Sequence, residues 1–484
     1  MGKTRLQPSQ DSLKSFNFSL LDIFAFLSRV TLIFCLVSSI SLVLYSSFAT
    51  RQHWLRSPAL VSKPGPDLGS GPTNISHILF GIGGSAAAWH DRSRYSSLWW
   101  KPSITRGFVW FDKIPRDIAN IPSTVPPRLS SRDWTKFRYS SSRSAVRIAR
   151  IIKESFELGL PHVRWFVMGD DDTVFYPENL VSLLRKYDHD QMWYIGGNSE
   201  SVEQDERHSY DMAFGGGGFA ISYVLAEKLV KVFDGCLDRY HYFYGSDQRV
   251  WACVSEIGVP LTMARGFHQF DIRGSPYGVL AAHPLTPLIS LHHLDYLDPI
   301  FPNQTKIDSL KALHNAYRVD PPRILQQSLC YDYSRRWSIS ISWGYTIRLY
   351  LSMIPAMDLQ SPLLTFKTWA SGMEGPFTFN TRRISPDPCE QPIFYLLDRV
   401  EEVERMSGTL TSYNVLDNKC NRTDHVLART VQRIVVSAMK MDPEYWNKAP
   451  QRQCCEIKDR GSMKDQSMRI RIRKCRPQET VTII

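Results

Sequence analysis

The chain has 484 residues, of which 43% are hydrophobic and 22% charged, and its lysines and arginines outnumber its acidic residues by 58 − 47 = 11. This composition is ordinary for a globular protein that is long enough for two domains and further segments. Because the sequence has neither a zinc-ligand spacing nor a nucleic-acid motif, the positive charge does not indicate a nucleic-acid partner. A basic run over 458–476 would suit an anionic partner, but we interpret it as a solvated tail.

An uncharged segment near the N-terminus predicts a membrane anchor. Residues 30–49 are long enough to span a bilayer as a helix. Ser47–Ala49 resembles a cleavage site, so a removed signal peptide is the alternative. The preceding region is long and already carries acidic residues, which favours an uncleaved anchor. We therefore expect a cytosolic tail over 1–29 and a Pro- and Gly-rich stem over 50–73.

The cysteines indicate an oxidising compartment. Of nine cysteines, eight follow the apolar segment, and an even number there is typical of disulfides in a lumenal domain. Glycosylation sequons begin at Asn74, Asn303 and Asn421 and agree with that side of the membrane, although each is weak alone.

Strands and helices alternate through the first part of the folded region. The predicted elements, in chain order, are a strand at 77–80, a helix at 86–100, a strand at 107–111, a serine-capped helix at 142–158 and a strand at 163–168. This order predicts a mostly parallel α/β sheet. The glycine-rich turn Gly81–Ser85 fits a phosphate cradle, but a simple tight turn explains it equally well.

Three aspartates end the strand over 163–168. Open α/β sheets bind ligands at the C-terminal ends of their strands, where Asp170, Asp171 and Asp172 stand. Adjacent carboxylates repel, and hard divalent cations prefer carboxylate oxygens. In an extended backbone Asp170 and Asp172 point the same way, so we expect them to share one ion, with Asp171 facing elsewhere. The alternative is an acidic surface turn.

A run of four glycines follows further along the chain. After a helix that starts at Pro177 and a strand at 192–195, Gly215, Gly216, Gly217 and Gly218 leave no side chains in the way of a sugar or nucleotide. A floppy loop is the alternative, although flanking apolar residues favour an ordered segment.

Asp247 is a carboxylate at the start of a predicted helix. Ser246 fits an N-cap, which places Asp247 in the first turn of a helix, where it alternatively only complements the helix dipole. Cys236 and Cys253 flank this segment and fit a disulfide. Three aromatic residues lie close to Asp247 in the sequence, Tyr242, Tyr244 and Trp251. They are candidates for stacking on a bound ligand, with core packing as the alternative.

Histidines downstream fit the same metal. His292 and His293 end an apolar run, and His268 is a lesser candidate. Beyond residue 306, the strict alternation over 337–343 predicts a strand, and 377–380 fits another. Six cysteines in this part indicate a disulfide-bonded, partly β accessory region over 306–484.

In this order, the motifs resemble the Fringe-like β-1,3-glycosyltransferases, and more closely their plant relatives. The resemblance covers about 75–305 and rests on 165–175, 195–197, 214–222, 245–247 and 290–295. It implies a GT-A-type nucleotide-sugar (Rossmann-like) catalytic domain over 74–305.

The resemblance also implies site residues. Asp170, Asp171 and Asp172 match the family's donor and metal site, with Mn²⁺ as the ion, His292 matches its metal-binding histidine, and Asp247 matches its base. Gly216, Gly217 and Gly218 would lie against the donor. The family usually has two acidic residues just before the base, where this sequence has Gly245 and Ser246.

Together these features predict a Golgi membrane-anchored, metal-dependent inverting enzyme that moves a sugar from a UDP-sugar to a glycan or glycoprotein hydroxyl, forming a β-1,3 linkage. A lumenal glycan-binding or scaffolding protein with the same fold and no activity is the alternative. A metal-dependent phosphohydrolase fits less well, because further acidic or histidine ligands are missing near the first strand.

Overall fold

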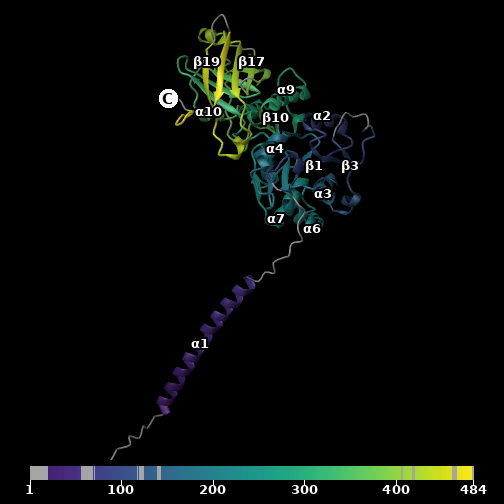
Figure 1. Cartoon of the computed structure of the whole chain (residues 1–484), viewed down its shortest axis with the longest axis vertical. Coiled ribbons are helices and arrows are strands. Elements are labelled where there is room, and N and C mark those ends of the chain that lie inside the picture. The colour runs from purple at the N-terminus through teal and green to yellow at the C-terminus, as the bar shows by residue number, and fades with distance from the viewer. Residues whose placement is uncertain are drawn as a thin grey trace, which may run out of the picture. The chain divides into compact units, whose positions relative to one another are not determined.

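The computed structural model describes residues 20–55, 69, 71–116, 118, 125–138, 143–404, 407–416, 420–460 and 466–481. The chain forms two units, Met1–Asp67 and Leu68–Ile484 (Figure 1). The predicted tail, most of the predicted stem and the serines before the helix at 143 lie outside the described residues.

The first unit contains the helix α1, Leu20–Leu55. Its apolar part, Phe24–Tyr45, has 22 residues with a mean hydropathy of 2.1 and begins before the predicted residue 30. By length and composition this helix can cross a membrane, as expected for an anchor, and a signal sequence meets the same criterion.

The second unit begins with a seven-stranded mixed sheet in the order β3-β2-β1-β4-β7-β6-β8. The strands are β1 Ile78–Gly83, β2 Arg106–Phe111, β3 Pro127–Leu129, β4 Trp165–Asp170, β6 Tyr194–Gly196, β7 Phe219–Ser222 and β8 Leu261–Met263. All neighbours are parallel except that β7 runs antiparallel to β4 and β6. The predicted mostly parallel α/β sheet is therefore confirmed, and the sequence did not indicate β3.

Both faces of this sheet are buried, because alternate side chains enter different cores. Ile78, Phe80 and Ile82 of β1 pack into one cluster, whereas Leu79 packs into the other. Helices α3, α6 and α7 cover the Leu79 side. The helices of this region are α2 Trp89–Trp99, α3 Arg143–Glu157, α4 Pro177–Leu184, α5 Val202–Arg207, α6 Tyr223–Arg239, α7 Ser246–Glu256, α8 Tyr277–Ala281 and α9 Lys306–Val319.

Two small sheets connect distant parts of the chain. One has the order β5-β11-β9, formed by Val174–Phe175, Ser290–Leu291 and Phe267–His268. The other pairs β10, Ile272–Gly274, with β15, Phe366–Thr368, and so joins the accessory region to the region before residue 305.

The accessory region contains an eight-stranded sheet in the order β12-β13-β14-β16-β17-β18-β20-β19. Its strands are β12 Gln327–Asp332, β13 Trp337–Ser342, β14 Thr346–Tyr350, β16 Ile393–Val403, β17 Gly408–Val415, β18 Arg433–Met439, β19 Cys454–Asp459 and β20 Ser467–Arg473, with short helices α10 Ala356–Gln360 and α11 Val426–Arg429. The predicted strand at 337–343 and the disulfide-bonded β character are confirmed.

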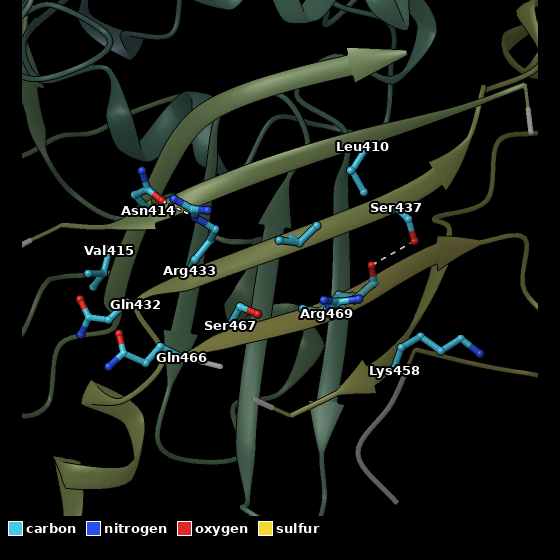
Figure 2. A pocket seen from close by; sticks show the side chains of 12 residues that line it. Leu410, Asn414, Val415, Gln432, Arg433, Ser437, Lys458, Gln466, Ser467 and Arg469 are labelled. Carbon is cyan, nitrogen blue, oxygen red and sulfur yellow. Dashed lines mark hydrogen bonds between the residues drawn. The ribbon is translucent and has the colours of Figure 1, made fainter. Parts of the chain in front are cut away.

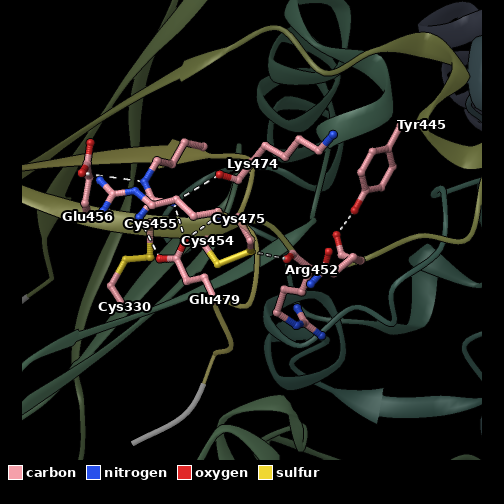
Figure 3. The surroundings of a disulfide bond; sticks show 12 residues. Cys330, Tyr445, Arg452, Cys454, Cys455, Glu456, Lys474, Cys475 and Glu479 are labelled. Atoms are coloured by element: carbon pink, nitrogen blue, oxygen red, sulfur yellow. Dashed lines mark hydrogen bonds and ion pairs between the residues drawn. A yellow bond between two sulfur atoms is a disulfide. The ribbon is translucent and has the colours of Figure 1, made fainter. Parts of the chain in front are cut away.

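The two edge strands of this sheet, β12 and β19, approach each other and are joined by side chains. A disulfide links Cys330 to Cys455, beside a second one between Cys454 and Cys475 (Figure 3). We call the line along which β12 and β19 meet the seam. Arg452 Nη1 also donates to the Gln327 carbonyl across this seam, at 2.7 Å. The seam covers edges that would otherwise expose unpaired backbone groups. The other two disulfides are Cys389–Cys420 and the expected Cys236–Cys253.

Three expectations from the sequence were wrong. Residues 377–380 form only an isolated bridge, from Phe377 to Ser201, because this segment packs on the first region rather than joining a sheet. Ser246 is the first helical residue of α7, and Gly245 is the N-cap. The basic run over 458–476 is not a tail, since most of its described residues form β19 and β20, and alternate residues of β20 are buried.

Breaking the seam should destabilise the accessory sheet. We expect Cys330→Ala/Cys455→Ala to lower the free energy of unfolding by about 2–4 kcal/mol, because the bond closes a separation of 125 residues in the unfolded chain. Urea denaturation followed by fluorescence measures the change. Cys35→Ala, at the free cysteine of α1, is the control. An unchanged midpoint in the double variant would show that the seam does not depend on this bond.

Candidate active site

The aspartate run forms a tight turn at the end of β4. Thr173 closes it, since its Oγ1 accepts from the Asp170 N–H at 2.9 Å and its N–H donates to the Asp170 carbonyl at 3.0 Å. The Thr173 hydroxyl also donates to the Gly216 carbonyl at 2.7 Å, which ties the turn to the glycine run. Asp171 and Asp172 are 2% and 1% exposed, so the run is not an acidic surface turn.

His292 faces the aspartates because of the register of the small sheet. Leu291 of β11 lies opposite Val174 of β5, so the residue after Leu291 meets the turn that precedes β5. His292 Nε2 lies 3.1 Å from Asp172 Oδ1 and 3.8 Å from Asp170 Oδ2. The ring fits only beside glycine, because a Cβ on Gly216 would lie 2.0 Å from its Cε1.

The other two candidate histidines contact carboxyl groups outside the aspartate run. His293 Nδ1 lies 2.8 Å from Asp271 Oδ1, and His268 Nδ1 lies 2.8 Å from Glu200 Oε1. Of the three histidines singled out in the sequence, His292 is therefore the one that the structure places with Asp170 and Asp172.

Arg92 of α2 supplies a counter-charge that the sequence analysis missed. Its Nη1 bonds Asp171 Oδ1 at 2.8 Å, and its Nη2 lies 3.1 Å from Asp172 Oδ2. The Ser85 N–H donates to the other Asp171 oxygen at 3.0 Å. The turn Gly81–Ser85 thus holds a carboxylate of the protein. The sequence offered only one weak signal for Arg92, a cation on the helix after that turn.

The three carboxyl groups have different pKa values. Burial, together with the neighbouring Asp172 and Asp171 carboxylates, raises the pKa of Asp170 to about 7. Burial also raises the pKa of Asp171, although Arg92 opposes it. At Asp172 burial acts in the same direction, but His292 and Arg92 outweigh it and hold the pKa well below its usual range.

The residues that meet here fit a divalent cation. Ligand atoms of Asp170, Asp172 and His292 lie within 4.8 Å of one another. Two carboxylates and an imidazole are a donor set that Mn²⁺ and similar ions accept. The Asp170 side chain remains 33% exposed, which leaves a path for a ligand to the ion. Asp171 faces Arg92 instead, as the alternation predicted.

Asp247 lies close to the aspartate run. It lines a small cavity of about 20 Å³ together with Asp170 and Gly215. Its Oδ2 accepts from the Gly215 N–H at 2.9 Å, and the Ser246 hydroxyl lies 3.3 Å from its Oδ1. These contacts fix the carboxyl group of Asp247 at the start of α7 beside the candidate metal site.

The rest of the glycine run is packed rather than open. The Gly217 N–H donates to Gln269 Oε1 at 2.7 Å, and its carbonyl accepts from the Ser290 hydroxyl. Gly218 has φ +90°, and a Cβ there would lie 2.8 Å from the Phe175 ring. The run is therefore ordered, as expected, and its contact with a donor remains a prediction.

The aromatic residues near Asp247 divide into two groups. Tyr242 and Tyr244 are 58% and 62% exposed and are accessible to an acceptor. Trp251 packs beside Phe243, with a ring-centroid distance of 6.2 Å, so core packing explains it.

The accessory region contributes a ring to the site. The His292 and His293 rings stack with centroids 4.0 Å apart, and Trp369 stacks on the other face of His293 at 5.1 Å. The Trp369 N–H donates to the Asp271 carbonyl at 3.1 Å, directly after the β10–β15 pairing. Trp369 thus fixes the neighbour of His292 from a segment that the sequence analysis could not assign.

Removing Arg92 should leave the buried carboxylates without a cation. We expect Arg92→Met to lower the free energy of unfolding by about 2 kcal/mol at pH 7. This is less than the loss expected when a fully buried ion pair is broken, because 28% of the Arg92 side chain is exposed. The pKa of Asp171, which burial already raises, would rise further without Arg92, so at this group the folded state would bind more protons than the unfolded state and the stability would fall as the pH rises. Urea denaturation should therefore give a larger deficit at pH 7 than at pH 5.

Arg94→Met is the matched control for this test. Arg94 lies on the same helix, is 59% exposed and pairs only loosely with Asp91, at 3.6 Å. We expect a change below about 0.5 kcal/mol. Equal effects of the two substitutions, or a deficit that does not depend on pH, would contradict the role given to Arg92.

Comparisons with known proteins agree with this geometry. A family model described as Fringe-like matches residues 129–275, which include the aspartate run, the glycine run and Asp247. This match confirms the resemblance and supports glycosyltransferase activity. A solved structure, mouse xyloside xylosyltransferase 1 in its apo form, matches with 10% identity over 39% of this chain and 84% of that chain. Its TM-score of 0.26 is too low to carry a structural argument.

A second family model covers more of the chain. It matches residues 204–455, more than half of the 484, and continues across residue 305 into the accessory region. That continuity agrees with the β10–β15 pairing and the Trp369 contact. The chain therefore belongs to the family described as Protein of unknown function, DUF604, and contains a Fringe-like region that overlaps this match.

Proposed function

We propose that the protein is a metal-dependent, inverting glycosyltransferase that moves a sugar from a UDP-sugar to a hydroxyl of a glycan or glycoprotein, with a β-1,3 linkage. One observation carries this proposal. Asp170, Asp172 and His292, which come from two distant segments, converge within 4.8 Å, and Asp247 lines the same small cavity as Asp170.

The residues have separate tasks in this reaction. Asp170, Asp172 and His292 would hold Mn²⁺, which when bound neutralises charge on the diphosphate leaving group. Arg92 opposes the rise in the pKa of Asp171 and holds its carboxyl group in place. Asp247 takes the proton of the acceptor hydroxyl on its carboxylate, which the Gly215 N–H holds in position. Attack of that hydroxyl on the face opposite the leaving group inverts the anomeric centre, as in single-displacement glycosidases.

The proposed location is the Golgi membrane, with the folded unit in the lumen. The apolar helix α1 would serve as the anchor of a single-pass protein. Four disulfides among the residues after it support an oxidising compartment.

Substitution of Asp247 tests the chemistry. With full-length protein, a panel of UDP-sugars and Mn²⁺, we expect Asp247→Asn to lower kcat by about 10²–10⁴-fold and to leave the Kd for UDP nearly unchanged, because the side chain acts on the acceptor. Asp172→Asn should lose UDP and Mn²⁺ binding together. Asp211→Asn, an exposed acid, is the control. Glycan binding without turnover, unaffected by Asp172→Asn, would instead indicate an inactive glycan-binding protein.

Trp369 offers a test that does not depend on turnover. Residues that orient a metal ligand indirectly contribute about 10–100-fold to metal affinity. We expect Trp369→Ala to weaken Mn²⁺ binding by about tenfold, because the His293 ring that supports His292 loses its stacking partner. Trp369→Phe should retain most of the affinity. Electron paramagnetic resonance titration of free Mn²⁺ measures the Kd, and equal values for Trp369→Ala and the unchanged protein would contradict this role.

A further inference from the structure

The basic run near the C-terminus becomes one face of a sheet. In β20 the side chains of Met468, Ile470 and Ile472 are buried, whereas Arg469 and Arg471 are exposed. Alternate residues of a strand are about 6.7 Å apart on the same face, so these arginines form a row. The neighbouring strands β18 and β19 add to the outer face of the sheet.

This outer face is hollowed. A depression of about 950 Å³ lies over β17, β18, β20 and β19, and its cationic lining residues are Arg433, Lys458 and Arg469. Figure 2 shows these side chains along the strands, together with Asn414 and Ser437. Among the described residues that line the depression, none carries a carboxylate. The depression is within the size range of ligand pockets, whereas an ordinary outer sheet face is flat and solvated.

The net charge of the exposed side chains of β18, β19 and β20 is positive. Glu456 and Asp459 on β19 lie opposite Arg471 and Arg469, and Lys458 pairs with Glu456 at 2.7 Å. Strands β18, β19 and β20 carry four exposed cations: Arg433, Lys458, Arg469 and Arg471. These cations exceed the two carboxylates by 4 − 2 = 2. On the other side of β17, strand β16 carries the acidic residues Asp398, Glu401 and Glu402. An anionic ligand would therefore be confined to the β18–β20 side.

The uncharged lining residues indicate the class of that ligand. They include five amide or hydroxyl side chains: Asn414, Gln432, Ser437, Gln466 and Ser467. Such groups pair with sugar hydroxyls, while guanidinium groups pair with carboxylates in a bidentate manner. A membrane surface would favour exposed large apolar side chains beside the cations, whereas the apolar residues that line the depression are partly or fully buried: Leu410, Val415, Val435 and Ile470. We propose that this face, which we call the basic sheet face, binds an acidic polysaccharide through its carboxylates.

The basic sheet face is separate from the candidate metal site. Its residues come from 410–471, and none of the residues that line the depression belongs to the group Asp170, Asp172 and His292. The inference does not rest on transferase activity, and it gives the accessory region a task of its own: holding a long anionic glycan. Binding to this face should leave UDP and Mn²⁺ affinity unchanged.

Binding of polygalacturonate by full-length protein in detergent tests the inference. We expect Arg469→Gln/Arg471→Gln to weaken binding at least tenfold and to reduce its dependence on salt between about 50 and about 200 mM, because fewer counterions are released. Arg433→Gln/Lys458→Gln should act in the same way, and it replaces the first variant if that one fails to fold. The methyl-esterified polymer, which is neutral, should bind at least tenfold more weakly than the acid.

Lys228→Gln/Lys231→Gln is the matched control, since it removes the same charge from exposed positions of α6. It should bind like the unchanged protein. Losses equal to those of the arginine variant would overturn the proposal, because net charge alone would then explain binding. Tighter binding of phosphatidylserine vesicles than of polygalacturonate, lost in the same arginine variant, would also overturn it and identify a lipid surface. Equal binding of dextran sulfate and polygalacturonate would overturn the assignment to carboxylates.

Discussion

Three consecutive carboxylates at the end of a buried strand are stable only where cations or hydrogen-bond donors surround them. The chain meets this constraint from separate segments. Arg92 comes from the helix after β1, and the Ser85 N–H comes from the turn before that helix. His292 directly follows β11 and lies 292 − 172 = 120 residues after Asp172. A divalent ion at Asp170 and Asp172 would complete the charge balance, so the acidic strand end and the candidate metal site coincide here.

Much of the surrounding structure serves this arrangement. The β5-β11-β9 sheet determines the position of His292 relative to the turn Asp170–Thr173, and Gly216 leaves room for the His292 ring. The accessory region contributes to the same site through β15, which pairs with β10, and through Trp369, whose ring stacks on the His293 ring. A family match that runs across both regions is consistent with one cooperative unit rather than a catalytic domain with an independent appendage.

The sequence predicted the parts of the site that rest on local patterns. An apolar strand that runs into Asp170–Asp172, a helix start beside Asp247 and an apolar run before His292 are visible without a structure. Arg92 and Trp369 were missed, because only strand pairing and helix packing between distant segments bring them to the site. The basic run was misread for a related reason: cations that alternate with Met468, Ile470 and Ile472 indicate a half-buried strand, but the charge count alone resembles a solvated tail.

The proposed reaction depends on one ion between two carboxylates and an imidazole. Anomalous diffraction from crystals grown with Mn²⁺ and UDP locates that ion directly. We expect a single strong peak within coordination distance, about 2.0–2.3 Å, of oxygens of Asp170 and Asp172 and of His292 Nε2, with diphosphate oxygens on its open side. A peak elsewhere, or UDP bound with Arg92 still pairing Asp172 and no metal between the three residues, would contradict the account.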